Sequence, residues 1–224
     1  MKIVYHGSKD IIKMPEFGKG KPHNDYGFGF YCTESLELAK EWAVESDRNG
    51  YANIYQIDDA ALSILNLNSP EYNILNWLAI LLENRQFDTP SGLALEAKEY
   101  ILTNFSVDYK NYDAIIGYRA DDSYFSFAQD FLNGTISYRQ LANAMHLGKL
   151  GLQFVLKSHK AFEMIEFKGY ETALYSEWYS KKESRDKTAK RNYLDSDKNK
   201  RLKGDIFVTH IIDEEMKNGD SRLR

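Results

Sequence analysis

The expected fold is decided by two stretches of sequence, Tyr5-His6-Gly7-Ser8 and Gly27-Phe28-Gly29-Phe30-Tyr31-Cys32-Thr33. In the first, the β-prone run Lys2-Ile3-Val4-Tyr5 ends at an imidazole, a glycine and a hydroxyl. A planar carboxamide ligand needs a backbone donor and a backbone acceptor at short range, and Gly7 has no Cβ to obstruct it. Ser8 can add a third hydrogen bond, so this strand end is a candidate binding edge.

The second stretch predicts a strand whose backbone passes close to another group, because two glycines lie in its aromatic run. Tyr31 lies where its ring can stack on a flat ligand. We expect Thr33 to cap the next helix, whose apolar face has three- and four-residue spacing and is formed by Leu36, Ala39, Trp42 and Ala43. Taken singly, these features also fit a core histidine at position 6, a packing tyrosine at position 31 and turn glycines.

Between these stretches, residues 9–26 have the glycines, prolines and mixed charge of an irregular loop. Three of its basic residues, Lys13, Lys19 and Lys21, can face a pyrophosphate. We therefore expect this segment to cover a ligand as a mobile lid.

The two stretches together resemble the ADP-ribosyltransferase superfamily, in particular its diphtheria-toxin and poly(ADP-ribose) polymerase branch. In that branch the first strand ends in His-Gly-Ser or His-Gly-Thr and the second reads Gly-x-Gly-x-Tyr-Phe. Over nearly its full length the chain resembles a bacterial domain family of unknown function related to these transferases, with further marks at 111–117, 120–122, 152–155 and 160–162. The resemblance implies an α+β fold with a split antiparallel β-sheet core, peripheral helices and a helical insertion.

The third signature residue of that branch is a glutamate at the start of a late strand, and this position is Gln153 here. By the resemblance, the glutamate holds a ribose hydroxyl and stabilises the oxocarbenium-like centre. A neutral amide can do only the first, and losing one such electrostatic partner costs about 2.7 to 4 kcal/mol. Asp121 and Asp122 are candidate assisting acids because they follow the buried-looking strand at 113–117, although they can equally cap the helix that begins near Tyr124.

The resemblance implies an NAD-dependent mono-ADP-ribosyltransferase with a macromolecular acceptor, either protein or nucleic acid. His6 would bind the adenosine-side ribose, and Tyr31 would stack on the nicotinamide ring while Gln153 orients the reacting ribose. The remaining NAD-binding candidates are Gly7, Ser8, Phe28, Ser35 and Trp42. Relatives of this kind often act as intracellular toxins paired with an antitoxin, which would be a protein partner.

Two other functions fit the same residues. With Gln153 in place of the acid, the cleft could hold NAD or an ADP-ribosylated ligand without turnover. Alternatively, the fold could be a protein-interaction scaffold with an aromatic surface, since the chain has 16 tyrosines and 12 phenylalanines. The order of His6, Gly7, Ser8 and Tyr31 favours the enzyme.

Composition excludes several classes. The 224 residues suffice for one domain with a sizeable core, and no apolar stretch is long enough to cross a bilayer. The chain begins on a strand rather than on a secretory leader, so we expect a cytoplasmic location and no membrane partner. The net charge of −4 argues against broad nucleic-acid binding, and the charged run 181–201 predicts a solvated helix. Cys32 has no disulfide partner, and the histidines lack metal-ligand spacing, so we expect no metal.

Hydrophobic periodicity predicts one α+β domain over residues 1–224. Strands are expected at 2–6, 28–33, 54–57, 62–67, 113–117 and 152–157. Helices are expected at 35–46, 71–83, 92–103, 123–132, 137–146 and 159–165. A helical insertion occupies about 69–105, and a helical and strand-like extension covers about 170–224, ending in a short strand-like run at 207–212.

Overall fold

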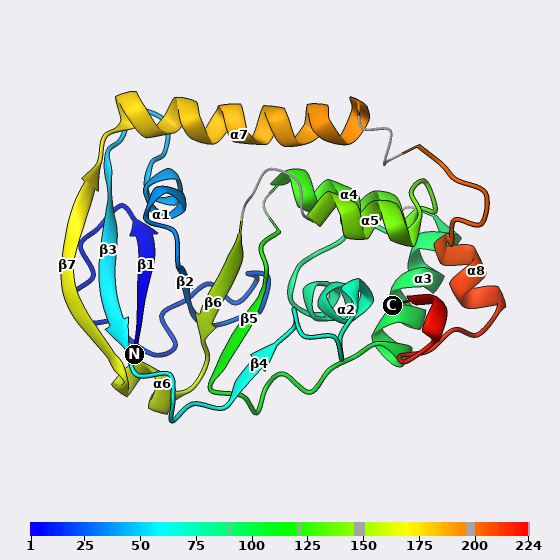
Figure 1. Cartoon of the computed structure of the whole chain (residues 1–224), viewed down its shortest axis with the longest axis horizontal. Helices are drawn as coiled ribbons and strands as arrows, with labels where there is room; N and C mark the ends of the chain where they lie inside the picture. Colours follow the sequence, from blue (N-terminus) through cyan, green and yellow to red (C-terminus); the bar gives the residue numbers. More distant parts are fainter. Residues whose placement is uncertain (90, 121, 146–150, 196–199, 224) are drawn as a thin grey trace.

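The computed structural model describes residues 1–224 except 90, 121, 146–150, 196–199 and 224 (Figure 1). Its centre is a seven-stranded sheet with the order β4-β5-β6-β2-β1-β3-β7. The strands are β1 (Lys2–Ser8), β2 (Phe30–Thr33), β3 (Gly50–Ile57), β4 (Ile64–Asn66), β5 (Ala114–Tyr118), β6 (Leu152–Leu156) and β7 (Ile165–Ala173). The α+β class predicted from the sequence is confirmed.

The sheet has two parts that meet weakly between β1 and β2. The register joins these strands at one pair among the described residues, Tyr5 with Thr33, whereas β1 pairs with β3 along its whole length. The pair β4–β5 is parallel and every other neighbouring pair is antiparallel, so the sheet is mixed rather than antiparallel throughout. Apart from this one pair, the facing edges of the described strands β1 and β2 are not joined in the middle of the sheet.

Helices flank the sheet. They are α1 (Leu36–Ala43), α2 (Ile74–Asn84), α3 (Gly92–Asn104), α4 (Asp122–Leu132), α5 (Tyr138–Met145), α6 (His159–Glu163), α7 (Tyr175–Asp195) and α8 (Val208–Asp213). A short 3₁₀ turn, Ser221–Leu223, follows near the end of the chain. Figure 1 shows α2, α3, α4, α5 and α8 gathered beside β4 and β5, with α7 running across the top from β7 toward this helical lobe.

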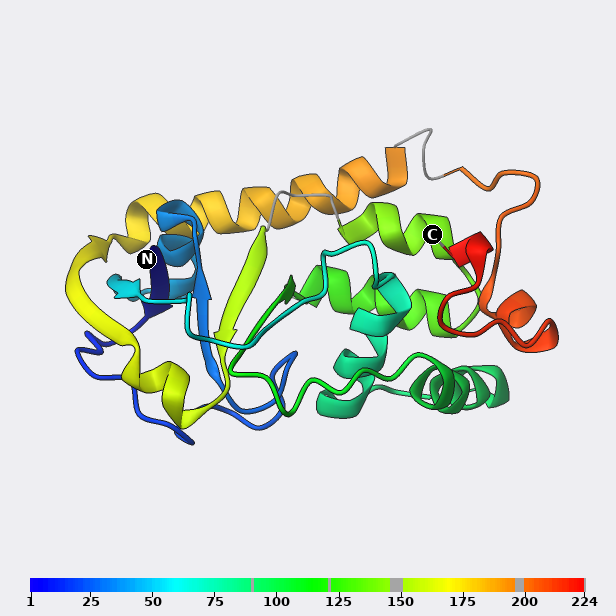
Figure 2. The same cartoon turned by 60° about the horizontal axis from the view of Figure 1, so that its bottom comes forward.

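Two apolar cores lie on opposite faces of the sheet. Because side chains alternate along a strand, Ile115 and Val155 face the helical lobe while Phe154 and Leu156 face the other core. The lobe core includes the fully buried Trp77 of α2. Figure 2 shows the same helices grouped on one side of β5 and β6. The predicted helical insertion is therefore part of a larger helical lobe, to which α4, α5 and α8 also contribute.

Helix α1 rests directly on the backbone of β1 and β3. A Cβ added at Gly7 would lie 2.0 Å from the Ala39 carbonyl oxygen, and one added at Gly50 would lie 2.1 Å from that of Ala43. Real Cβ atoms do not approach carbonyl oxygens so closely, so both positions need glycine for packing. From the sequence, we explained the missing Cβ of Gly7 by the approach of a ligand, but in the structure α1 occupies the position that this Cβ would take.

The sequence predictions fail at two places in the C-terminal part. Residues 207–212 were expected as a strand-like run but form α8, because Val208 and Ile211 lie three residues apart and both bury against the lobe. Strand β7 was missed, although Ile165, Phe167 and Gly169 alternate with polar residues in its sequence. The helix expected within the charged run 181–201 is present as α7, which begins at Tyr175 and ends at Asp195.

Candidate functional site

A cleft of about 990 Å³ lies where β1, β2 and β6 meet α1, α7 and the irregular segment before β2. Of the residues predicted from the sequence, it is lined by His6, Gly7, Ser8, Tyr31, Trp42 and Gln153. Its volume is at the upper end of the range of small-molecule and cofactor sites, about 300 to 1,000 Å³. The cleft thus lies at the weak β1–β2 junction.

Two predicted NAD-binding residues lie elsewhere. Phe28 is 51% exposed and Ser35 is the N-cap of α1, where its Oγ accepts from the Leu38 amide at 3.2 Å; neither lines the cleft. The expected cap, Thr33, instead accepts a hydrogen bond from the amide of Ser35. Of the candidate assisting acids, Asp121 lies outside the described residues, and Asp122 is the first residue of α4 with no side-chain placement described.

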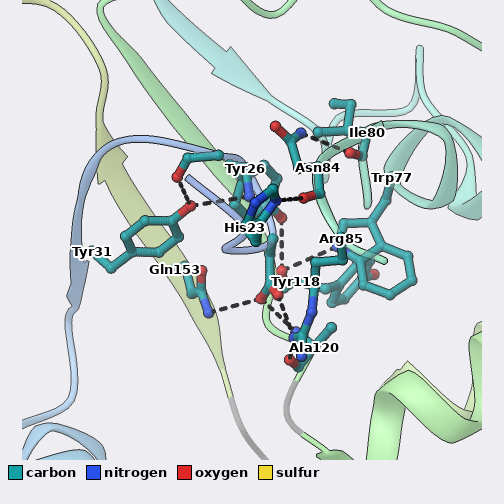
Figure 3. Close-up of polar contacts among 12 residues, drawn as sticks. His23, Tyr26, Tyr31, Trp77, Ile80, Asn84, Arg85, Tyr118, Ala120 and Gln153 are labelled. Carbon is teal, nitrogen blue, oxygen red and sulfur yellow. Dashed lines mark hydrogen bonds and ion pairs between the residues drawn. The ribbon is translucent and has the colours of Figure 1, made fainter. Parts of the chain in front are cut away.

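Tyr31 and Gln153 point to the same face of the sheet. Tyr31 pairs with Val155 on β6, and Gln153 is two residues from Val155, so the two side chains are diagonal neighbours (Figure 3). The Tyr31 hydroxyl donates to the Gly27 carbonyl at 2.6 Å and accepts from the Tyr26 amide at 3.0 Å. Burial raises the pKa of Tyr31 well above its usual value, so the phenol stays protonated. Its hydroxyl holds the loop, which leaves only the ring for a ligand.

His6 faces the other side of the sheet. Tyr5 pairs with Thr33 on the Tyr31 face, so His6 points away from it and its ring stacks on Phe30 at a centroid distance of 4.3 Å. Nδ1 lies 2.7 Å from the Tyr31 carbonyl oxygen, which can only accept, so Nδ1 carries the proton. Burial lowers the pKa of His6, although this hydrogen bond opposes the shift. The ring is therefore neutral, and Nε2 is a hydrogen-bond acceptor.

Asp25 is a cleft residue that the sequence analysis missed. Its carboxylate accepts from Arg85 Nη1 at 2.9 Å, from the Ala120 amide at 2.8 Å and from Gln153 Nε2 at 3.4 Å. Burial raises the pKa of Asp25, while the Ala120 amide and Arg85 act in the opposite direction. No local sequence pattern predicts this cluster, because Arg85 lies 60 residues further along the chain.

Gln153 and Trp42 line the cleft, and each has one buried side-chain atom with no hydrogen-bond partner among the described residues: the acceptor Oε1 of Gln153 and the donor Nε1 of Trp42. Leaving a buried polar atom unpaired costs about 1 to 3 kcal/mol, and such atoms often mark ligand sites. The guanidinium of Arg119 lies 4.3 Å from the Trp42 ring centroid. A ligand with both a hydroxyl donor and an acceptor would complement these atoms.

The cleft is basic in an acidic chain. Eight Lys or Arg residues and four Asp or Glu residues line it, whereas the whole chain has a net charge of −4. All three lysines predicted to face a pyrophosphate, Lys13, Lys19 and Lys21, are among them. Concave sites of one charge sign concentrate ligands of the opposite sign. The site therefore favours an anionic ligand.

The irregular segment is anchored at both ends. At its start, the buried Asn53 accepts from the Ile12 amide at 2.9 Å and donates to the Asp10 carbonyl at 3.2 Å. At its end, the Lys157 ammonium donates to the carbonyls of Tyr26 and Phe28. Burial lowers the pKa of Lys157 to about 8. These contacts confine any lid movement to the residues between the two anchors.

One wall of the cleft joins α1 to α7. The Glu41 carboxylate accepts from Arg185 at 2.8 and 2.7 Å in a two-pronged ion pair, and the Glu41 side chain is 4% exposed. Lys182 of α7 also lines the cleft. The long charged helix, which the sequence suggested to be a solvated face, thus contributes basic side chains to the site.

The fold and site define an α+β chain with a basic cleft of about 990 Å³ at a split in its sheet. A family model described as "Protein of unknown function (DUF3990)" matches residues 1–167, and the chain belongs to this family. No curated protein and no solved structure matches it. In the described part of the chain, no helix is long and apolar enough to cross a membrane, and no cluster of three potential metal ligands was found.

Proposed function

We propose that this protein is an NAD-dependent mono-ADP-ribosyltransferase that uses a macromolecular acceptor. The observation that carries the proposal is the buried, unpartnered Oε1 of Gln153, a residue that lines a basic cleft together with Tyr31. A dinucleotide has the chemistry that this site lacks: hydroxyl donors for Gln153, a pyrophosphate for the lysines and a flat ring for Tyr31. The residues at hand thus fit NAD as a co-substrate.

Each group in the cleft has a role in this proposal. Gln153 Oε1 accepts a hydroxyl of the reacting ribose, and the neutral His6 Nε2 accepts one from the adenosine-side ribose. Trp42 Nε1 donates to an acceptor atom of the ligand. Lys13 and Lys21 neutralise the pyrophosphate.

The proposed reaction exchanges one bond for another. The bond between the nicotinamide nitrogen and the ribose carbon breaks, and nicotinamide departs as a neutral base with the electron pair. A nucleophile of the acceptor forms a bond to the same carbon and gives its proton to solvent or a nearby base. Because nicotinamide leaves without accepting a proton, the protein must mainly position the ribose and stabilise positive charge.

A second candidate is an NAD- or ADP-ribose-binding module without turnover. The neutral amide of Gln153 favours this alternative, because an amide can bind a ribose hydroxyl but cannot stabilise an oxocarbenium ion as a carboxylate does. Binding without nicotinamide release would identify it.

The test measures NAD affinity by calorimetry and nicotinamide release with purified protein. Gln153→Met keeps the side-chain length and removes both polar atoms. Gln129→Met is the matched control, because Gln129 lies on α4 outside the cleft and bonds the Asp88 carbonyl. We expect wild type and Gln129→Met to release nicotinamide at similar rates. The rate for Gln153→Met should be about a hundredfold lower. Equal rates in all three proteins would contradict the proposal.

A further inference from the structure

The amide of Gln153 is fixed at one end and unsatisfied at the other. Nε2 donates to Asp25 Oδ2 at 3.4 Å, and the buried Oε1 has no partner among the described residues (Figure 3). The two ends of an amide have nearly the same shape, so its orientation is set by what each end meets. A carboxylate only accepts hydrogen bonds, so Asp25 keeps Nε2 toward itself and leaves Oε1 for another donor.

Asp25 is itself held rigidly. Arg85, just after α2, and the amide of Ala120, just after β5, both bond its carboxylate, and its side chain is 6% exposed. The Tyr31 hydroxyl holds the next residues of the loop, Tyr26 and Gly27. Asp25 therefore meets Gln153 from a fixed position rather than from the tip of a loop.

We propose that Asp25 is the positioning residue of the cleft: it orients the Gln153 amide so that Oε1 accepts a ligand hydroxyl, and its negative charge strengthens that acceptor. Hydrogen bonds in a chain polarise one another, so an amide that donates to a carboxylate is a stronger acceptor at its oxygen. This inference rests on the proposed function and extends it to a residue other than the signature residues His6, Tyr31 and Gln153.

The same arrangement accounts for glutamine at position 153. A carboxylate in place of the amide nitrogen would lie about as close to Asp25 Oδ2 as Nε2 does, at 3.4 Å. Two carboxylates at that distance cannot both ionise without a large penalty, so one of them would take up a proton. An amide at position 153 avoids this repulsion, because only Asp25 of the two residues is then an acid.

The test is a double-mutant cycle made of Asp25→Asn, Gln153→Glu and the double variant, which exchanges amide and carboxylate. Each single variant should lower kcat for nicotinamide release about tenfold or more with a smaller effect on KM. The double variant should be less impaired than the two single effects combined, because one carboxylate again faces one amide. Thermal unfolding should follow the same pattern, with Gln153→Glu destabilising only the protein that retains Asp25.

Asp205→Asn is the matched control for loss of a buried, arginine-paired acid. The Asp205 side chain is 4% exposed and bonds Arg139 at 2.8 Å outside the cleft. We expect this variant to lose thermal stability with kcat unchanged. Asp25→Asn kinetics equal to wild type, or a double variant as impaired as the two single effects combined, would overturn the inference.

The cycle also separates this inference from the proposed function. If wild type binds NAD without releasing nicotinamide, the enzyme proposal fails, and the cycle is then measured on NAD affinity and thermal unfolding. Non-additive effects on both would uphold the orientation of Gln153 by Asp25. Additive effects on either would overturn it, whatever the catalytic activity.

Discussion

The imidazole Nδ1 of His6 lies 2.7 Å from the backbone carbonyl oxygen of Tyr31, across the junction where β1 and β2 share one residue pair. The side chain supplies a hydrogen bond at a point where the strands separate. Both residues line the cleft, His6 from one face of the sheet and Tyr31 from the other. Because β1 and β2 separate at this junction, residues of both strands line the cleft.

His6 should make the protein sensitive to mild acid. Because burial lowers the pKa of His6 below 6.5, the unfolded chain takes up a proton first as the pH falls. The contribution of His6 to stability is therefore lost as the pH falls from 6.5 through the lower folded pKa. In His6→Asn, whose amide can still donate to the Tyr31 carbonyl, Tm should fall less between pH 7 and about 5. An equal fall in both proteins would contradict this role.

Gly7→Ala should destabilise the fold through α1. Its Cβ would meet the Ala39 carbonyl oxygen at 2.0 Å, so the helix must shift, at a cost of about 1 to 3 kcal/mol. Gly92→Ala is the control, since Gly92 is the first residue of α3 and has open space around its Cβ position. Chemical denaturation should show a loss for the first variant and none for the second. Unchanged stability of Gly7→Ala would mean that α1 does not need this close contact.

Lys157 should give an unusual dependence on alkaline pH. Its folded pKa is about 8 against 10.5 for an ordinary lysine, so the unfolded chain binds more protons between these values. Stability should therefore rise with pH from about 8 to about 10.5 relative to Lys157→Met, which keeps the apolar stem. Thermal unfolding of both proteins across this range measures the difference. Parallel curves would show that the fold does not perturb this ammonium.

The ion pair between α1 and α7 offers a test of how the long helix is attached. Arg185→Met leaves the buried Glu41 carboxylate without its partner, which typically costs about 3 to 5 kcal/mol. Glu41→Gln combined with Arg185→Met removes both charges and should recover most of that loss. Denaturant midpoints of the two variants provide the comparison, and a double variant as unstable as the single one would contradict a pairwise role.

The sequence predicted structure best where the pattern within one segment is enough to identify its strand or helix. Local glycines, aromatic runs and periodicity predicted strands at 2–6 and 28–33 and a helix at 35–46. The structure has these elements at Lys2–Ser8, Phe30–Thr33 and Leu36–Ala43. The six predicted site residues that line the cleft all belong to these segments or to β6. Local pattern sufficed because each of these side chains is placed by its own strand or helix.

The remaining site residues depend on contacts between distant segments. Asp25 lies in an irregular stretch, and only folding brings it to Arg85 and Gln153. Asn53 looks like an ordinary strand residue until its amide is found holding the start of the loop. In α8, burial of Val208 and Ile211 on successive turns outweighed the β-strand propensity of its β-branched residues.

The measurement that tests the central claim most directly follows ADP-ribose itself. Purified protein is incubated with NAD labelled on its adenine, with and without bacterial lysate, and the label on macromolecules is compared with nicotinamide released. We predict that label transfer requires the lysate, matches nicotinamide release and is lost in Gln153→Met but not in Gln129→Met. NAD binding with neither transfer nor release would contradict the transferase and leave a binding module.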